Sequence, residues 1–247
     1  MTTNLPTPRR ALAIAAHPDD IEFGCGGTFA KWSRDGCEIF HLVCTDGSKG
    51  SWDAAQDPTE LVATRQAEQR AAARVLGGTT EIVFLGWPDG ELEASRDQQR
   101  EIARWIRTIA PDVLLGHDPW KRHRLHPDHR NAGFLLTDGV VAARDPLFFP
   151  GLGLPPHRPT TILLFEAETV DHVEDITDSL ETKIEALLEH RSQLRSTMGI
   201  PDQDTHGGPG LDAFRERIRT EAAKFATPYG IRGSRRIQAA RGINKPL

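Results

Sequence analysis

The sequence predicts an α/β fold: a Rossmann-like, mostly parallel sheet with helices on both faces, forming a single domain. Two observations lead to this prediction. Continuous apolar runs alternate with amphipathic stretches four times in succession, and each apolar run ends in glycine or polar residues. A chain of 247 residues is long enough to bury one large core of this kind without a second domain.

The strands of the expected repeat are short and apolar. Residues 11–16 read Ala-Leu-Ala-Ile-Ala-Ala, a continuous run that is typical of a strand buried on both faces. The four strands are expected at residues 11–16, 38–44, 81–85 and 113–116.

A helix is expected after each strand. A glycine-rich loop at residues 24–27 precedes the first helix, Gly77 and Gly78 stop the second, and Ser95 is a suitable N-cap for the third. The helices are expected at residues 28–35, 58–76 and 95–109, and from residue 126 or 128 through residue 143.

The last third of the chain has a different pattern. Residues 144–159 contain five prolines, which excludes a helix and indicates a surface loop that could border the site. Further elements are expected as a strand at 161–166, helices at 178–195 and 211–225, and a second Gly/Pro-rich loop at 198–210. We expect a disordered lead-in at residues 1–10, the folded domain at residues 11–235 and a C-terminal tail at residues 236–247.

The composition excludes several classes of function. The formal net charge is −5 and the isoelectric point is about 6.1, so neither nucleic acid nor a membrane is expected as a partner. No apolar run approaches the ~20 residues of a membrane span, and the polar N-terminus lacks the apolar core of a signal peptide. The three cysteines form no CxxC pair, which favours a reducing, cytoplasmic location.

Two short segments carry the same ligand chemistry. AHPDD at residues 16–20 closes the first strand, and HPDH at residues 126–129 opens the fourth helix. Histidine and carboxylate together suit zinc in a three-ligand catalytic site, and the same ligands are compatible with Fe(II). In the first segment we expect His17 and Asp20 to ligate the metal and Asp19 to face the attacking water.

In the second segment His126 and His129 are three residues apart, so they share one face of the helix start. One can ligate the metal while the other stands beside the substrate. Asp128 can then accept a hydrogen bond from an imidazole and fix its orientation.

The two segments are expected to meet because ligands of doubly wound sheets bind beyond the carboxyl ends of the strands. The polar residues that fall at this edge are His17, Asp19, Asp20, Asp46, Asp89, His117, Asp118 and residues 126–129. His117 and Asp118 are left out of the metal set, because they could equally be a polar exit from the strand.

Six segments carry a resemblance to a known family: AHPDDIEFGCGGT, CTDG, TRQAEQRAAARVLG, LGWPDG, HPDH and TKIEALLEHRSQ. Together they resemble the PIG-L or LmbE-like family of N-acetylglucosaminyl-phosphatidylinositol deacetylases, which includes mycothiol-pathway deacetylases. The resemblance runs from about residue 12 to residue 225. It implies a zinc-dependent N-deacetylase with a Rossmann-like fold.

The resemblance also implies roles for individual residues. These roles are zinc ligation by His17, Asp20 and His129, general-base catalysis by Asp19, oxyanion stabilisation by His126, orientation of a histidine by Asp128, and substrate contact by Arg65 and Asp89. Two of them have structural alternatives: Arg65 could pair with Glu68 or Gln69 on the helix surface, and Asp89 before a glycine is ordinary turn chemistry.

The implied function is removal of an N-acetyl group from a small, amino-sugar-like or polar substrate by zinc-activated water, with Asp19 as the general base. The alternative is an amidase that cleaves a different acyl amide, in a thiol conjugate or an N-acyl natural product, because loops such as residues 144–159 set the acyl size. A metal-binding module without activity is disfavoured, because it would need no base at Asp19. Phe148 and Phe149 suit either a subunit contact in a homo-oligomer or a lid.

One feature departs from the family pattern. Some relatives carry a tyrosine shortly before the second segment, whereas the single tyrosine of this chain is Tyr229. Arg122, His123 or Arg124 could occupy that place instead. Trp52 and Trp120, both in expected loops, are candidates for stacking on a sugar ring.

Overall fold

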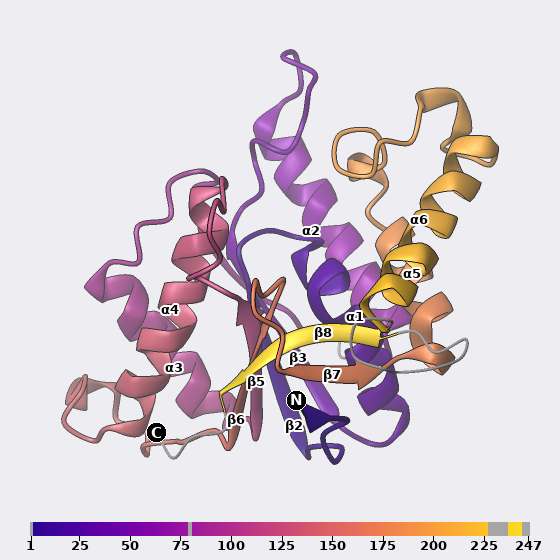
Figure 1. Ribbon diagram of the computed structural model, residues 1–247. Helices are drawn as coiled ribbons and strands as arrows, with labels where there is room; N and C mark the ends of the chain where they lie inside the picture. The colour runs from indigo at the N-terminus through magenta and orange to yellow at the C-terminus, as the bar shows by residue number, and fades with distance from the viewer. Residues whose placement is uncertain (1, 79–80, 227–236, 244–247) are drawn as a thin grey trace.

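The chain forms an eight-stranded, mostly parallel sheet, as predicted from the βα repeats (Figure 1). This computed structural model describes residues 2–78, 81–226 and 237–243. The spatial order of the strands is β1-β7-β8-β6-β5-β2-β3-β4, and only β8 runs antiparallel to its neighbours among the described strands. The strands are β1 (Thr2–Thr3), β2 (Arg10–Ala15), β3 (Glu38–Thr45), β4 (Val83–Trp87), β5 (Val113–His117), β6 (Thr161–Phe165), β7 (His172–Asp175) and β8 (Ile237–Ile243).

Helices cover both faces of the sheet, with α3 and α4 on one side and α1, α2, α5 and α6 on the other (Figure 1). Their bounds are α1 (Asp20–Arg34), α2 (Pro58–Val75), α3 (Arg96–Ile109), α4 (Pro127–Arg144), α5 (Leu180–Leu188) and α6 (Pro209–Ala226). Short 3-10 turns lie at Pro150–Leu152, Thr177–Ser179, Arg191–Gln193 and Asp202–Asp204.

Local sequence signals explain where two of these helices begin. The Asp57 side chain accepts hydrogen bonds from the amides of Thr59 and Glu60 at the start of α2. Ser95 and Gln98 form a reciprocal capping box at the start of α3.

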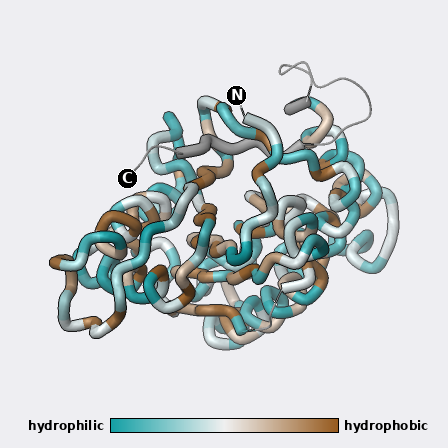
Figure 2. The backbone as a smooth tube through the Cα atoms, turned by 90° about the horizontal axis from the view of Figure 1, so that it is seen from below, coloured by the Kyte–Doolittle hydropathy of each residue, from teal (hydrophilic) through white to brown (hydrophobic). Residues whose placement is uncertain are grey.

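The central strand β2 divides the core into two layers. Ala11, Ala13 and Ala15 face the cluster built with α1, while Leu12 and Ile14 face the cluster built with α3 and α4. All five side chains are fully buried, which is why this strand reads as a continuous apolar run. Figure 2 shows hydrophobic stretches of the backbone running through the interior between the flanking helices.

The first helix begins earlier than the sequence suggested. Residues 24–27 were expected in a loop before a helix at 28–35, but α1 starts at Asp20 and contains all three glycines. The glycines permit close approach: a Cβ on Gly24 would lie 2.5 Å from the Phe165 ring, and one on Gly27 would lie 2.6 Å from Ile176. The AHPDD segment at residues 16–20 therefore leads directly into α1 without an intervening loop.

Other boundaries differ by a few residues, with two additions near the chain ends. The third strand runs over Val83–Trp87 instead of residues 81–85, and the predicted helix 178–195 divides into α5 and a 3-10 turn. Thr2–Thr3, in the expected lead-in, pairs with β7, and Ile237–Ile243, in the expected tail, forms β8 between β6 and β7.

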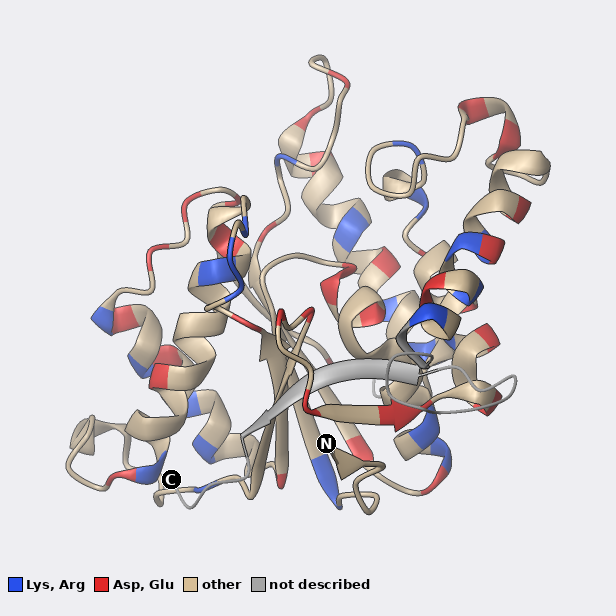
Figure 3. Cartoon of the chain, viewed as in Figure 1, with Lys and Arg blue, Asp and Glu red and all other residues tan. Residues whose placement is uncertain are grey.

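Charges of both signs are interspersed on the surface shown in Figure 3. On α6, Arg215 and Arg219 pair with Glu185 and Glu181 of α5. Within the described part of the chain, no helix combines the length and the apolar character that crossing a bilayer requires.

Candidate active site

A cavity of about 500 Å³ lies at the carboxyl ends of the parallel strands. It contains seven of the eight residues predicted for the site: His17, Asp19, Asp20, Arg65, Asp89, His126 and His129. The other lining residues are Phe23, Lys49, Gly50, Gly90, Glu166, Gln193 and Thr197. The eighth predicted residue, Asp128, is fully buried behind His17.

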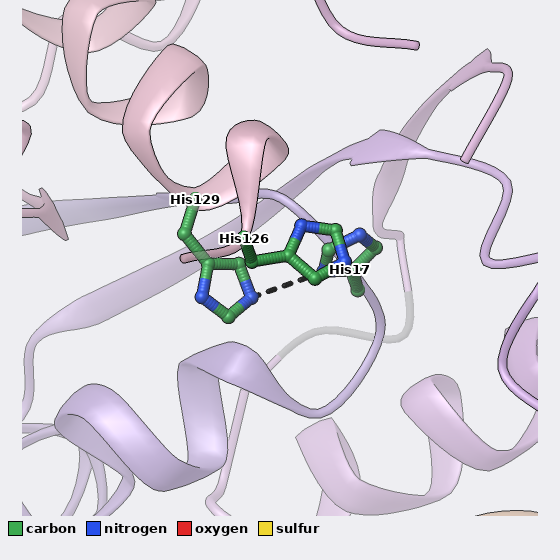
Figure 4. Close-up of side chains that lie close together, drawn as sticks. All are labelled: His17, His126 and His129. Atoms are coloured by element: carbon green, nitrogen blue, oxygen red, sulfur yellow. Dashed lines mark hydrogen bonds between the residues drawn. The ribbon is translucent and has the colours of Figure 1, made fainter. Parts of the chain in front are cut away.

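The donor atoms of the three predicted metal ligands converge. His17 Nδ1 lies 3.2 Å from His129 Nε2 and 3.4 Å from Asp20 Oδ2, and His129 Nε2 lies 3.2 Å from Asp20 Oδ1. Figure 4 shows His17 reaching from the turn after β2 toward His129 at the start of α4. Donors around tetrahedral zinc, with bonds of about 2.0–2.1 Å, are separated by about 3.3 Å. The donor set and its spacing therefore fit zinc.

The orientation of His17 is fixed from its other nitrogen. His17 Nε2 lies 3.1 Å from Asp89 Oδ1 and 3.2 Å from Asp128 Oδ2, and carboxylates can only accept hydrogen bonds. The proton of a neutral His17 therefore resides on Nε2, and the lone pair of Nδ1 points toward Asp20 and His129. Asp89, predicted to contact substrate, thus shares with Asp128 the task of orienting this histidine.

Asp128 is itself held firmly. Its Oδ2 accepts a hydrogen bond from the Gly90 amide at 2.6 Å, and its Oδ1 accepts one from the Leu92 amide at 3.1 Å. Burial acts to raise the pKa of Asp128, but the hydrogen bonds from His17 and these two amides lower it below its usual range. The carboxylate is therefore negative beside His17.

Asp19 lies beside the ligands without sharing their contacts. Its backbone is left-handed, with φ 96° and ψ −28°. Burial raises the pKa of Asp19 to about 6, while the Arg65 guanidinium, whose Nη2 is 3.5 Å from Asp19 Oδ2, opposes this rise. A pKa close to neutrality suits a general base.

Arg65 is buried in the wall of the cavity. Its Nη2 donates to the Pro18 carbonyl at 2.7 Å and its Nη1 donates to the Gly47 carbonyl at 2.9 Å. Of the two alternative partners on the helix surface, Glu68 accepts hydrogen bonds from Ser192 and Gln69 accepts one from the Asp19 amide. Arg65 therefore ties together the turns that follow β2 and β3.

His126 combines an exposed position with a defined tautomer. As the N-cap of α4, its Nδ1 accepts a hydrogen bond from the Asp128 amide at 3.3 Å. Partial burial and the imidazoles of His17 and His129 lower the pKa of His126, which favours the neutral ring. A neutral His126 with an acceptor at Nδ1 carries its proton on Nε2, so that Nε2 can donate a hydrogen bond.

The structure adds two residues that were not in the predicted set. His117, at the end of β5, places Nε2 3.1 Å from Asp20 Oδ2 and stacks on His129 with centroids 4.4 Å apart. Its Nδ1 lies 3.4 Å from Glu166, which directly follows β6. His117, which ends β5, was already expected at this edge of the sheet, and the same rule could have found Glu166.

Of the three residues expected in place of the tyrosine of some relatives, both arginines have carboxylate partners. Arg124 is buried and its Nη1 donates to Glu166 at 2.7 Å, whereas Arg122 pairs with Glu168 at the surface. Tyr229 lies outside the described residues. Trp52 and Trp120 are exposed, and neither is among the described residues that line the cavity.

Comparisons with known proteins identify relatives of this chain. The family model described as GlcNAc-PI de-N-acetylase matches residues 12–140. A diacetylchitobiose deacetylase from Thermococcus kodakarensis is 36% identical over 188 residues, which cover 75% of this chain and 70% of that protein. A 1D-myo-inositol 2-acetamido-2-deoxy-alpha-D-glucopyranoside deacetylase from Streptomyces avermitilis is 29% identical over 171 residues, which cover 60% of this chain and 58% of that protein.

A solved structure extends the similarity to the whole fold. The N,N'-diacetylchitobiose deacetylase from Pyrococcus horikoshii matches with a TM-score of 0.84 and 32% identity, covering 96% of this chain and 84% of that one. The segment matched by the family model contains both His-Pro-Asp motifs and all eight predicted site residues. The chain therefore belongs to the PIG-L family of GlcNAc-PI de-N-acetylases.

Proposed function

We propose that this protein is a zinc-dependent N-deacetylase that hydrolyses the acetamide of a small amino-sugar substrate. The observation that carries the proposal is the convergence of two imidazole nitrogens and one carboxylate in a cavity that also holds Asp19 and His126. His17 Nδ1 lies 3.2 Å from His129 Nε2, and the two oxygens of Asp20 lie 3.4 and 3.2 Å from these nitrogens. A module that only binds metal would need the three ligands. It would need neither the buried carboxylate of Asp19 beside them nor the imidazole N–H of His126. Amide hydrolysis needs both.

His17, Asp20 and His129 would hold the metal. Bound zinc would supply a Lewis acid that polarises the amide carbonyl and lowers the pKa of water. Fe(II) suits the same ligands, so the identity of the metal is part of the proposal.

The side chains of the protein move the protons. Asp19 takes a proton from the attacking water as its oxygen bonds to the acyl carbon, a contribution of about 10²–10⁴ in rate. His126 Nε2–H donates to the developing oxyanion, which is typically worth about 3 kcal/mol. Asp19 then returns its proton to the nitrogen as the C–N bond breaks, leaving acetate and a free amine.

The cavity suits a polyhydroxylated substrate. Its volume of about 500 Å³ lies in the range of small-molecule sites. The lining includes a cation, an anion and a neutral amide that can form hydrogen bonds: Lys49, Glu166 and Gln193. The similar proteins from Thermococcus and Streptomyces are both named as deacetylases of acetylated amino sugars. These observations favour an amino sugar over a thiol conjugate or a long-chain N-acyl product.

The test is acetate release from N-acetylglucosamine and N,N'-diacetylchitobiose by the zinc-loaded protein, beside amides with longer acyl chains. We expect the acetylated sugars to be cleaved fastest. Asp19→Asn should retain zinc but lose at least about 100-fold in turnover. Asp118→Asn, which changes a buried carboxylate outside the ligand set, is the control. Wild-type turnover in Asp19→Asn, or faster cleavage of long-chain amides, would overturn the proposal.

A further inference from the structure

The backbone of Asp19 adopts a conformation that side chains rarely tolerate. Its φ of 96° lies in the left-handed region that favours glycine, yet an aspartate is required there if this residue is the base. Such a conformation persists only when surrounding contacts hold it. The contacts of Asp19 therefore bear on the position of the carboxylate.

One of these contacts comes from Gln69 on α2. The Gln69 side chain is fully buried, and its Oε1 accepts a hydrogen bond from the Asp19 amide at 2.9 Å. An amide N–H can only donate, so the oxygen of the Gln69 side chain must face Asp19 and its NH₂ group must face away.

The far side of Gln69 is fixed by Glu22. Gln69 Nε2 donates to Glu22 Oε1 at 2.8 Å, and His190 Nε2 lies 3.2 Å from Glu22 Oε2. Glu22 and His190 are fully buried as well. Because a carboxylate only accepts hydrogen bonds, Glu22 imposes the one orientation of the Gln69 amide that can hold Asp19.

These contacts form a chain that runs from His190 through Glu22 and Gln69 to the backbone of Asp19. None of the residues Glu22, Gln69 and His190 was predicted for the site. None of them is among the described residues that line the cavity. A buried polar chain of this kind rigidifies its surroundings when every link is satisfied.

We propose that Gln69 and Glu22 are positioning residues, which hold the left-handed backbone of Asp19 so that its carboxylate faces the attacking water. They act through Asp19: among the described side-chain hydrogen bonds, theirs go to Asp19, to each other, and to histidines outside the predicted ligand set. Loss of either residue should slow the chemical step and leave substrate binding and zinc in place.

The inference rests on the proposed deacetylase function, so the wild type and Asp19→Asn are assayed first. Gln69→Leu removes both hydrogen bonds at similar volume. We expect kcat to fall about 10–100-fold while KM changes less than about threefold and the zinc content stays that of the wild type. Gln99→Leu is the matched control, because Gln99 is a helical glutamine that donates to Asp138 far from the cavity. It should leave kcat and KM unchanged.

Glu22→Gln is a milder variant that keeps the buried volume. A glutamine at residue 22 can donate as well as accept, so the Gln69 amide is free to turn its NH₂ group toward Asp19. We expect kcat to fall about 3–30-fold, again without a change in KM. In the Gln69→Leu background the same substitution should cause no further loss, because the link through Gln69 is already broken.

Three results would overturn the inference while the wild type remains active: kcat within twofold of wild type in both single variants, a rise in KM that accounts for the loss, or loss of zinc in parallel with activity. An inactive wild type would instead contradict the proposed function. If Gln69→Leu fails to fold, Glu22→Gln alone decides by the same three criteria.

Discussion

At the scale of single residues, the site depends on which nitrogen of each histidine carries a proton. His17 presents Nδ1 to the other ligands because Asp89 and Asp128 occupy Nε2, and His126 frees Nε2–H because its Nδ1 caps α4. In the proposed site, neighbouring carboxylates and amides thus prepare one histidine for metal binding and another for hydrogen-bond donation.

Asp128→Asn tests this assignment. Both oxygens of Asp128 accept hydrogen bonds from backbone amides, so an asparagine NH₂ group would face an N–H donor in either orientation. We expect the zinc affinity to fall about 10–100-fold, measured by competition with a chromogenic chelator. Asp118→Asn, whose Oδ1 accepts from the Trp120 amide, should bind zinc like the wild type. Equal affinities in the two variants would contradict the role of Asp128.

Site residues inside the two motifs could be predicted from the local sequence, whereas a residue such as Gln69, far from the motifs, could not. The two His-Pro-Asp segments indicated His17 and Asp20, because ligand chemistry is compressed into a few positions, and the family resemblance implied His129 as the third ligand. Gln69 gave no such signal, since its contact with Asp19 exists only once α2 lies beside the first turn.

At the scale of elements, α1 shows how packing overrides composition. Three glycines in four positions predicted a loop, yet the helix runs through them because α5, Phe165 and Ile176 approach closely. Propensity is a weak prior, and Phe165 and Ile176 come from more than 140 positions further along the chain than the glycines they contact. A local reading of the sequence could not detect them.

Adjacent glycines of α1 should therefore respond to alanine in opposite directions. A Cβ at Gly27 would lie 2.6 Å from Ile176, so Gly27→Ala should destabilise by about 1–3 kcal/mol. A Cβ at Gly26 would lie 3.4 Å from Lys183 and 3.8 Å from Glu22 and Leu76, which are ordinary contact distances, so Gly26→Ala should stabilise by about 0.5–1 kcal/mol. Urea denaturation measures both free energies of unfolding. The same sign in both variants would contradict the packing argument.

At the scale of the whole molecule, the strands β2 to β6 were predicted from the sequence, whereas β1, β7 and β8, at the other edge of the sheet, were not. Continuous apolar runs mark β2 and β5, which helices cover on both faces. The segments that form β1, β7 and β8 lack such runs, and their places depend on pairing between distant parts of the chain. Pairing of this kind leaves little trace in local periodicity.

Glu174 of β7 joins these distant parts. Its carboxylate accepts hydrogen bonds from the Leu5 amide, His172 Nε2 and Lys31 Nζ, at 2.7, 3.0 and 2.7 Å. Burial acts to raise the pKa of Glu174, but these partners lower it below its usual range. A carboxyl group with a lowered pKa in the folded state stabilises the fold fully above its unfolded pKa, about 4.3, and progressively less as the pH falls.

Glu174→Gln should accordingly lower the melting temperature at pH 7, by about 2–4 °C for each kcal/mol lost, and the difference should shrink toward pH 3. Thermal unfolding followed by circular dichroism across this range measures it. Glu181→Gln, which changes an exposed partner of Arg219, should have little effect at either pH. A difference that grows on acidification would contradict the assigned sign.

The central claim is that deacetylation depends on a metal held by the three converging ligands. The most direct measurement is acetate release from N,N'-diacetylchitobiose while chelator-treated protein is titrated with zinc. We predict that activity rises with zinc and reaches its plateau at one zinc per chain, whereas His129→Ala reaches no plateau at that stoichiometry. Full activity in the chelated protein, or no acetate release with one zinc bound, would contradict the account.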